Sequence, residues 1–196
     1  MLVIGNGESR RNVDISKIKS NKIGCNAIYR DCPVNHLVCV DQKMVREAIA
    51  AGANNDALVY TRSDWYYRLK SKRLRMVPDL PYAGQERPDE PFHWGSGPYA
   101  VLLGAKITKT NLQLIGFDLY SKDGKLNNVY KNTENYKLSS SRAVDPRYWI
   151  HQIGKVFEFF PNINFTIYQE NNWQMPKVWK RDNVTVDNIS NIYYNN

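Results

Sequence analysis

Apolar residues along this chain alternate between short runs and longer runs with helical spacing. The short runs are rich in β-branched and aliphatic residues and are bounded by polar or glycine positions, which predicts strands. The longer runs begin at capping residues such as Asp41 and Ser63 and end at glycine or polar residues, which predicts helices. Strands are predicted at 2–4, 22–25, 36–40, 57–60, 112–116 and 163–168, and helices at 14–18, 41–51, 63–69, 97–107 and 147–160.

Three segments fall outside this alternation. Residues 77–94 contain four prolines and are predicted to form a loop. A polar segment at about 121–147 is too long for a plain connection, and such loops are commonly functional lids. Residues 171–196 are predicted to form a C-terminal tail with a weak strand pattern at 184–186, so the domain itself is predicted to span 1–170.

Strands alternating with helices in a chain of 196 residues predict one α/β domain with a Rossmann-like, mostly parallel sheet, helices on both faces and a lid-like insertion. Ligands bind such sheets at the carboxyl ends of the strands, near the point where the strand order reverses. The residues predicted to lie there, after strands or at helix starts, are Gly5, Asn6, Gly7, Ser9, Asn26, Asp41, Gly95, Ser96, Gly97, Asp118 and Tyr120.

Composition and charge narrow the class of protein. Hydrophobic residues make up 42% and charged residues 23%, and no run has the length of a membrane span or the pattern of a signal peptide, so a soluble cytoplasmic protein is expected. The three cysteines, Cys25, Cys32 and Cys39, lack the spacing of a zinc site or a disulfide framework. The net charge of +8 suits an anionic ligand such as a nucleotide or nucleic acid, and equally a solvated basic surface.

The turn at residues 5–9 follows the first predicted strand. Its glycines leave no Cβ between the backbone and a ligand, and Asn6 and Ser9 carry short side chains that can bond a phosphate, a ribose or a base. Arg10 stands where a dinucleotide-binding fingerprint has its third glycine, and the lysine of a P-loop is missing. An ordinary strand-to-loop turn explains the same residues.

Two further groups of residues carry candidate chemistry. Gly95, Ser96 and Gly97 open a predicted helix, where backbone amides and a hydroxyl could hold an anion, although a plain N-cap has the same sequence. Asp118 follows a buried strand, where it could bind a ribose or an acceptor hydroxyl or cap a turn.

His151 is the most interesting titratable residue in the sequence. It follows Tyr148 by three positions on a predicted helix, so the two side chains share a face. An imidazole can remove a proton from a hydroxyl near neutral pH, whereas a partly buried structural histidine is the alternative.

The order of these motifs resembles the bacterial sialyltransferases of glycosyltransferase family 42. The motifs are G-N-G-x-S at 5–9, C-N at 25–26, S-G at 96–97, G-x-D-x-Y at 116–120 and Y-x-x-H at 148–151. The first half of the chain and the G-x-D strand also resemble 6-hydroxymethylpterin diphosphokinase-like proteins. The resemblance covers about residues 1–168.

The resemblance implies a single Rossmann-like domain that binds a CMP-sugar with no metal or other cofactor. It implies that Asn6 and Ser9 contact the donor phosphate and ribose, and that Asn26 contacts the cytidine-sugar region. Ser96 and Gly97 would approach the sugar carboxylate or the phosphate, and Asp118 would hold the nucleotide. Tyr120 and Tyr148 would bond the leaving phosphate, and His151 would deprotonate the acceptor hydroxyl. Three places differ from the family pattern, since His93 replaces an arginine, Gly95 a threonine and Asp41 an asparagine.

The sequence therefore predicts a glycosyltransferase whose partners are a nucleotide-sugar donor and a glycan or other hydroxyl acceptor. Pterin-type diphosphoryl transfer is an alternative, in which Asp41 and Asp118 would bind magnesium with ATP. A non-catalytic nucleotide- or nucleic-acid-binding protein is another, because aromatic residues interleave with basic ones near Trp65. The sequence leaves oligomerisation open.

Overall fold

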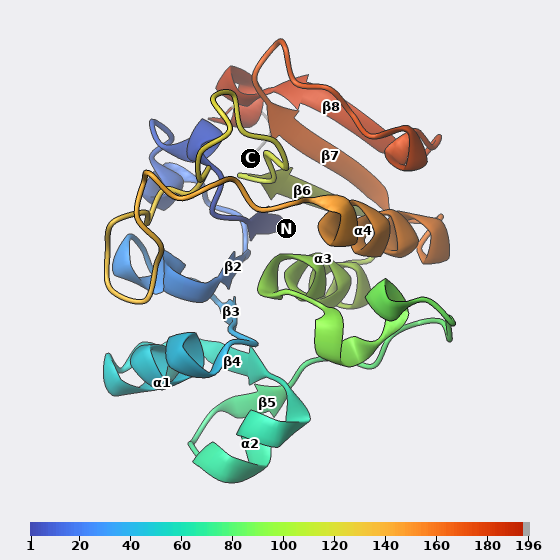
Figure 1. Cartoon of the computed structure of the whole chain (residues 1–196). Coiled ribbons are helices and arrows are strands. Elements are labelled where there is room, and N and C mark those ends of the chain that lie inside the picture. The colour runs from blue at the N-terminus through green and yellow to red at the C-terminus, as the bar shows by residue number, and fades with distance from the viewer. Residues whose placement is uncertain (194–196) are drawn as a thin grey trace.

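The computed structural model of this chain describes residues 1–193 and contains one eight-stranded sheet (Figure 1). Every pair of neighbouring strands in it is parallel, and the strand order is β5-β4-β3-β2-β1-β6-β7-β8. The strands are β1 (Leu2–Ile4), β2 (Lys22–Cys25), β3 (His36–Val38), β4 (Leu58–Thr61), β5 (Leu74–Met76), β6 (Asn111–Ile115), β7 (Asn164–Gln169) and β8 (Val184–Asn188). The α-helices are α1 (Gln42–Ala50), α2 (Ser63–Leu69), α3 (Ser96–Ile107) and α4 (Arg147–Phe159). This is the predicted α/β class.

Strand β1 lies in the middle of the sheet, and this position locates the crossover. Val3 is paired with Ile23 of β2 on one side and with Leu114 of β6 on the other. From β1 the chain adds strands outward to β5, and it then returns to place β6 against the free edge of β1. The strand order therefore reverses between β1 and β6, where doubly wound sheets bind their ligands.

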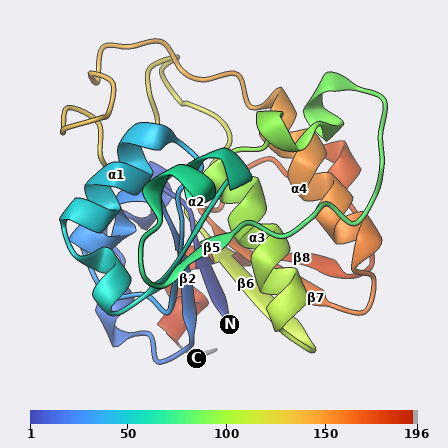
Figure 2. The same ribbon diagram turned by 90° about the horizontal axis from the view of Figure 1, so that it is seen from below.

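Alternating side chains of the strands build two hydrophobic cores, one on each face. Val3 belongs to the core under α3 and α4, whereas Leu2 and Ile4 belong to the core under α1. This division follows from the period of two along a strand. The ribbon views place α3 and α4 on one face and α1 on the other (Figures 1 and 2). Both faces are covered, as parallel sheets require.

The predicted elements and the observed ones differ in a few places. Strand β5 was not predicted, because Leu74–Met76 is short and two of its three residues are exposed. Ser63 was predicted as the cap of α2 but is its first residue, and Arg62 occupies the cap position without a side-chain bond. The segment after residue 170 contributes β8, which pairs with β7. Residues 194–196, the end of the predicted tail, lie outside the described residues.

The predicted lid is a long irregular segment between β6 and α4. Residues 122–146 run across the carboxyl end of the sheet from the α1 side to the start of α4, in yellow and gold in Figure 2. A single antiparallel bridge between Lys125 and Arg142 ties its two halves together. Leu126 and Tyr130 are buried, so part of this segment packs on the domain.

Candidate functional site at the crossover

A cavity of about 330 Å³ lies at the carboxyl ends of β1, β2, β3 and β6. Nine of the ten residues predicted to bind a nucleotide-sugar line it, and only Ser9 does not. The cavity also has an apolar wall that includes Trp149 and Ile153 of α4. The predicted residues that line it are Gly5, Asn6, Gly7, Asn26, Asp41, Gly95, Ser96, Gly97 and Asp118.

The glycines after β1 allow two loops to pack against each other. The amide of Gly5 donates to the carbonyl of Ile115 at 2.8 Å, and the amide of Gly7 donates to the carbonyl of Gly116 at 2.9 Å. A Cβ on Gly5 would lie 2.3 Å from the Gly116 carbonyl oxygen. Of these three glycines only Gly116 needs the left-handed backbone, with φ of +73°. The space predicted for a ligand beside Gly5 is therefore occupied by the loop after β6.

Asp118 and Ser9 form a second connection between these loops. The Ser9 hydroxyl and backbone amide donate to the two carboxylate oxygens of Asp118 at 2.5 and 2.9 Å. A Cβ on Gly7 would lie 2.3 Å from the same carboxylate. Ser9 thus holds Asp118 in place from outside the central cavity, and Asp118 lines the cavity with its orientation already fixed.

Arg10 holds the turn after β1 in place, a role that the sequence did not predict. Its guanidinium is buried and donates through Nε to the carbonyl of Gly5 at 2.7 Å and through Nη2 to the hydroxyl of Tyr130 at 2.8 Å. An ion pair with Asp31 at 3.3 Å balances its charge. A buried arginine without such partners would be strongly destabilising. Because Tyr130 belongs to the lid, this one side chain connects the turn to the lid.

Ser96, at the start of α3, connects the ends of two strands, β2 and β3. Its hydroxyl donates to the side-chain oxygen of Asn26 at 2.8 Å and accepts from the amide of Val40 at 3.1 Å. Asn26 adopts a φ of +52°, which brings its amide group to this position. Since the hydroxyl hydrogen is engaged within the protein, an anion at this helix start would meet the backbone amides that lack intrahelical acceptors. Gly95 is the N-cap residue and provides no side-chain bond.

Asp41 caps α1, as the sequence predicted. One carboxylate oxygen accepts from the amides of Lys43 and Met44 at 2.8 and 3.4 Å. Asp41 and Asp118 are the charged side chains among the described residues that line the central cavity. The cavity wall is therefore acidic, whereas the whole chain carries a net charge of +8. Carboxylates of this kind accept hydrogen bonds from hydroxyl or amino groups and repel phosphate.

The three residues predicted to be catalytic are not among the residues that line the central cavity. On α4 the lining residues are Trp149 and Ile153, and His151 lies on the opposite side of the helix from them. The Nε2 atom of His151 lies 2.6 Å from a carboxylate oxygen of Asp89, in the short turn Arg87–Asp89. The Tyr148 ring makes an edge contact with His93 of the same loop region, so Tyr148 and His151 share a helix face as expected. Tyr120 lines a neighbouring cavity.

The Asp89–His151 pair has its own electrostatics. Asp89 is 8% exposed, and burial alone would raise its pKa. The hydrogen bonds from His151 and from the backbone amide of Glu86 outweigh burial, so the pKa of Asp89 is lowered overall. Asp89 therefore carries its negative charge at neutral pH beside the imidazole.

The lid contacts both the cavity and α1. Asn6 accepts at its backbone carbonyl from the amide of Val129 at 2.9 Å, and its side-chain nitrogen donates to the Tyr136 hydroxyl at 3.3 Å. The side-chain oxygen of Asn6 is buried and has no hydrogen-bond partner among the described residues. Asn127 and Asn128 of the lid line the cavity directly. The lid is therefore part of the wall of this site.

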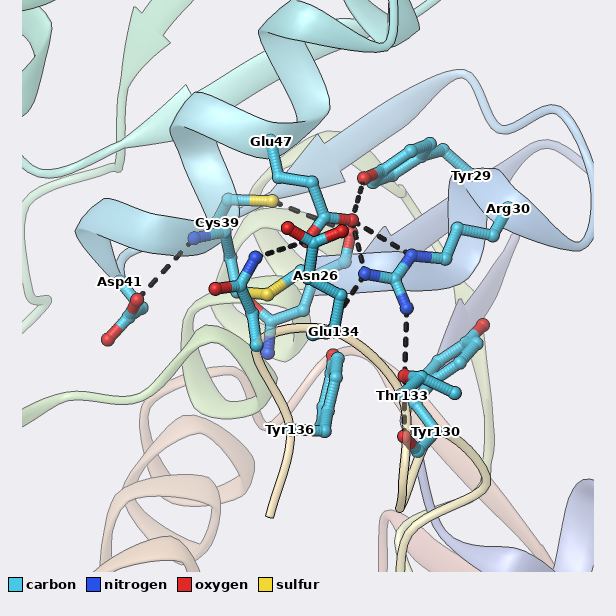
Figure 3. Close-up of polar contacts among 12 residues, drawn as sticks. Asn26, Tyr29, Arg30, Cys39, Asp41, Glu47, Tyr130, Thr133, Glu134 and Tyr136 are labelled. Atoms are coloured by element: carbon cyan, nitrogen blue, oxygen red, sulfur yellow. Dashed lines mark hydrogen bonds and ion pairs between the residues drawn. The ribbon is translucent and has the colours of Figure 1, made fainter. Parts of the chain in front are cut away.

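A polar cluster fastens the lid to α1 (Figure 3). Glu47 of α1 accepts from Arg30 Nε at 2.8 Å and from the side-chain nitrogen of Asn135 in the lid at 2.6 Å. Arg30 also donates to the Thr133 hydroxyl at 2.9 Å. Burial would raise the pKa of Glu47, but the hydrogen bonds from Arg30, Tyr29 and Asn135 lower it overall. The carboxylate of Glu47 thus joins two segments to α1, the one that follows β2, through Arg30, and the lid, through Asn135.

The cavity region has few other features that decide its chemistry. Within residues 1–193, no three histidine, cysteine, aspartate or glutamate side chains cluster so that they could hold a metal ion. No helix in the same part of the chain has both the length and the apolar composition to cross a bilayer. Comparisons with protein-family models, with curated proteins and with solved structures find no match to this chain.

Proposed function

We propose that this chain is a glycosyltransferase that moves a sugar from a nucleotide-activated donor, most simply a CMP-linked one, to the hydroxyl of an acceptor. The observation that carries the proposal is the cavity at the β1–β6 crossover, which is lined by nine of the ten residues expected to hold such a donor. Crossovers in parallel sheets are the usual place for nucleotides. The order of the motifs, which resembles glycosyltransferase family 42, gives the reaction class.

The chemistry of the wall supports an orientation for the donor. Asp41 and Asp118 offer acceptors for the hydroxyl and amino groups of a nucleoside, and Trp149 offers an aromatic surface. The phosphate belongs at the start of α3, because the unpaired amides and the helix dipole favour negative charge there.

The proposed reaction is a displacement at the anomeric carbon of the donor. The acceptor oxygen bonds to this carbon, the bond to the phosphate oxygen breaks, and its electron pair leaves with CMP. The resemblance implies that the acceptor proton passes to His151. Its Nε2 is engaged by Asp89, so Nδ1 is the atom that would receive the proton once the acceptor hydroxyl reaches this side of α4. A carboxylate bound to one ring nitrogen is a common way to orient a catalytic imidazole. The amides at the start of α3 would stabilise the charge on the departing phosphate, since Tyr120 and Tyr148, which the resemblance implies for this part, do not line the central cavity.

Ligand binding is tested by thermal shift. CMP is expected to raise the melting temperature more than UDP, GDP or ATP, because a ligand that binds only the folded state stabilises it by mass action. Trp149→Ala should remove most of this shift, whereas Trp65→Ala on α2, away from the cavity, should keep it. Equal shifts in both variants, or no shift with any nucleotide, would exclude nucleotide binding in this cavity.

Catalysis is tested separately, by release of CMP from a CMP-sugar in the presence of an acceptor. His151→Ala should lose transfer while CMP still raises the melting temperature. The control is His36→Ala, since His36 lies at the start of β3 and does not line the cavity. Unchanged transfer by the His151 variant would remove this residue from the mechanism.

Diphosphoryl transfer to a pterin-like hydroxyl is the second candidate. The observation that favours it is that Asp41 and Asp118 line the same cavity, because magnesium is commonly held by one or two carboxylates together with substrate phosphates. A thermal shift with ATP that requires magnesium, in place of a metal-independent shift with CMP, would select this reaction.

A further inference from the structure

A second cavity of about 440 Å³ lies next to the first, at the carboxyl ends of β6 and β7. Its walls come from the loop after β6, which includes Tyr120 and Ser121, and from the loop after β7, which includes Asn172 and Trp173. Asp118 and Asn127 line both cavities. A molecule held in the second cavity would therefore lie beside one held in the first.

Gln169 is the observation that marks this cavity as a site. It is the last residue of β7, lines the cavity and is only 2% exposed. Its side-chain nitrogen is buried and has no hydrogen-bond partner among the described residues. A buried donor without an acceptor is unfavourable, and each such group calls for an explanation. A bound molecule that supplies an acceptor oxygen would satisfy it.

Apart from the Trp173 indole, the uncharged polar groups of the cavity are amides and hydroxyls. Asn172 and Gln174 come from the loop after β7, and Tyr120 faces them from the loop after β6. Each amide provides a donor and an acceptor side by side, which matches pairs of neighbouring hydroxyl groups. Trp173 gives the cavity an aromatic wall, and its position is fixed because Nε1 donates to the Asp118 carbonyl at 2.7 Å.

The charges at this cavity cancel or are already engaged. Lys122 and Glu170 form an ion pair with each other at the exposed edge. Asp118 accepts two hydrogen bonds from Ser9. An anionic molecule would find no unpaired cation among these lining residues, whereas an uncharged molecule rich in hydroxyls meets amides, hydroxyls and an aromatic surface.

We propose that the second cavity binds a neutral saccharide, which serves as the acceptor for the donor in the first cavity. The acceptor part of this statement rests on the function proposed above, whereas the binding of a saccharide does not. Asp118 and Asn127 form the boundary between the two molecules. Asn127 is held rigidly there, because it accepts from the amide of Glu8 and donates to the carbonyl of Tyr120, both at 2.8 Å.

Saturation-transfer NMR tests the proposal with a panel of glucose, galactose, mannose and N-acetylglucosamine, with and without CMP. At least one sugar should receive saturation from the unmodified protein. Gln169→Met removes the amide but keeps the side-chain length, and it should abolish this transfer. The free protein should keep its melting temperature, because the buried nitrogen loses no bond.

Two further variants keep the result interpretable. Asn172→Ala changes an exposed residue of the cavity, so it should fold normally and also weaken sugar saturation. Gln113→Met is the matched control, because Gln113 donates to the Tyr168 hydroxyl at 3.4 Å and lies outside this cavity. This control should bind sugar as the unmodified protein does.

The outcomes separate the two proposals. Absence of saturation for every sugar in both conditions, or full saturation in the Gln169 and Asn172 variants, would overturn the second site. Sugar saturation that depends on Gln169, without any thermal shift from CMP, would support the saccharide site and contradict the proposed transferase.

Discussion

Replacing Gly5 by alanine should destabilise the fold, although the residue lines the candidate site. The new Cβ would lie 2.3 Å from the carbonyl oxygen of Gly116 and 2.9 Å from its carbonyl carbon. Both are backbone atoms of a neighbouring strand end, so they cannot rotate away as a flexible side chain would. Gly5 also donates to Ile115 and accepts from Arg10, and separation of the two loops would weaken both bonds.

The size of this effect follows from the clash and from the two bonds. Overpacking in a well-packed site typically costs about 1–3 kcal/mol, and each weakened hydrogen bond adds about 0.5–1.5 kcal/mol. We therefore expect a loss of about 3 kcal/mol in the free energy of unfolding. For a chain of this size, roughly 2–4 °C per kcal/mol converts this into a drop in melting temperature of about 6–12 °C.

The assay is urea unfolding of Gly5→Ala beside Gly97→Ala, a second glycine of the same cavity. A Cβ on Gly97 would lie 3.5 Å from the Phe117 ring, which is an ordinary contact. Alanine there should leave stability unchanged or raise it by about 0.4–1 kcal/mol. If Gly5→Ala unfolds at the same urea concentration as the unmodified protein and loses only nucleotide binding, the contact between the loops is not the reason for the glycine.

Two other predictions concern the lid and the thiols. Glu47→Gln should increase hydrogen exchange in residues 122–146, whereas Glu134→Gln should not, because Glu134 contacts Arg30 only through its backbone. The pKa of Glu47 is lowered in the folded protein, so the stability contributed by its ionised carboxylate is fully present above the ordinary value of 4.5 and is lost as the pH falls through the folded-state pKa. Acid should therefore increase hydrogen exchange in the lid of the unmodified protein as well. Burial raises the pKa of Cys25 to about 12 and that of Cys39 well above its usual value. Both thiols should therefore react with a disulfide reagent at pH 8 only after the protein unfolds. Rapid reaction in the native protein would contradict their burial.

Most of the helices and strands, and the position of the cavity, could be predicted from the sequence. Apolar runs with a clear period located β1 and β2 at their observed bounds, because these strands are buried and bounded by polar residues. The rule that parallel strands end at one edge then brought together loops as distant as those at Asn6, Asn26 and Asp118. Strand β5 was not predicted, because an exposed edge strand has little apolar pattern.

The parts that could not be predicted depend on contacts between distant positions. Arg10 has no helical or strand pattern around it, and its partners Asp31 and Tyr130 lie far along the chain. Trp149 and Gln169 become cavity residues only when α4 and β7 are placed beside β6. The partner of His151 was equally hidden, since Asp89 lies in a proline-rich loop without periodicity.

The central position of β1 has a consequence for how the molecule is assembled during synthesis. The first strand made can pair with β2 early, but its other edge stays open until residues 111–115 have left the ribosome. An open apolar strand edge invites association with other chains, so a nascent or truncated chain that ends before β6 is the form most in need of a chaperone. Because the candidate cavity lies across this late-formed junction, any ligand that binds there would stabilise only chains in which the two halves of the sheet have already joined.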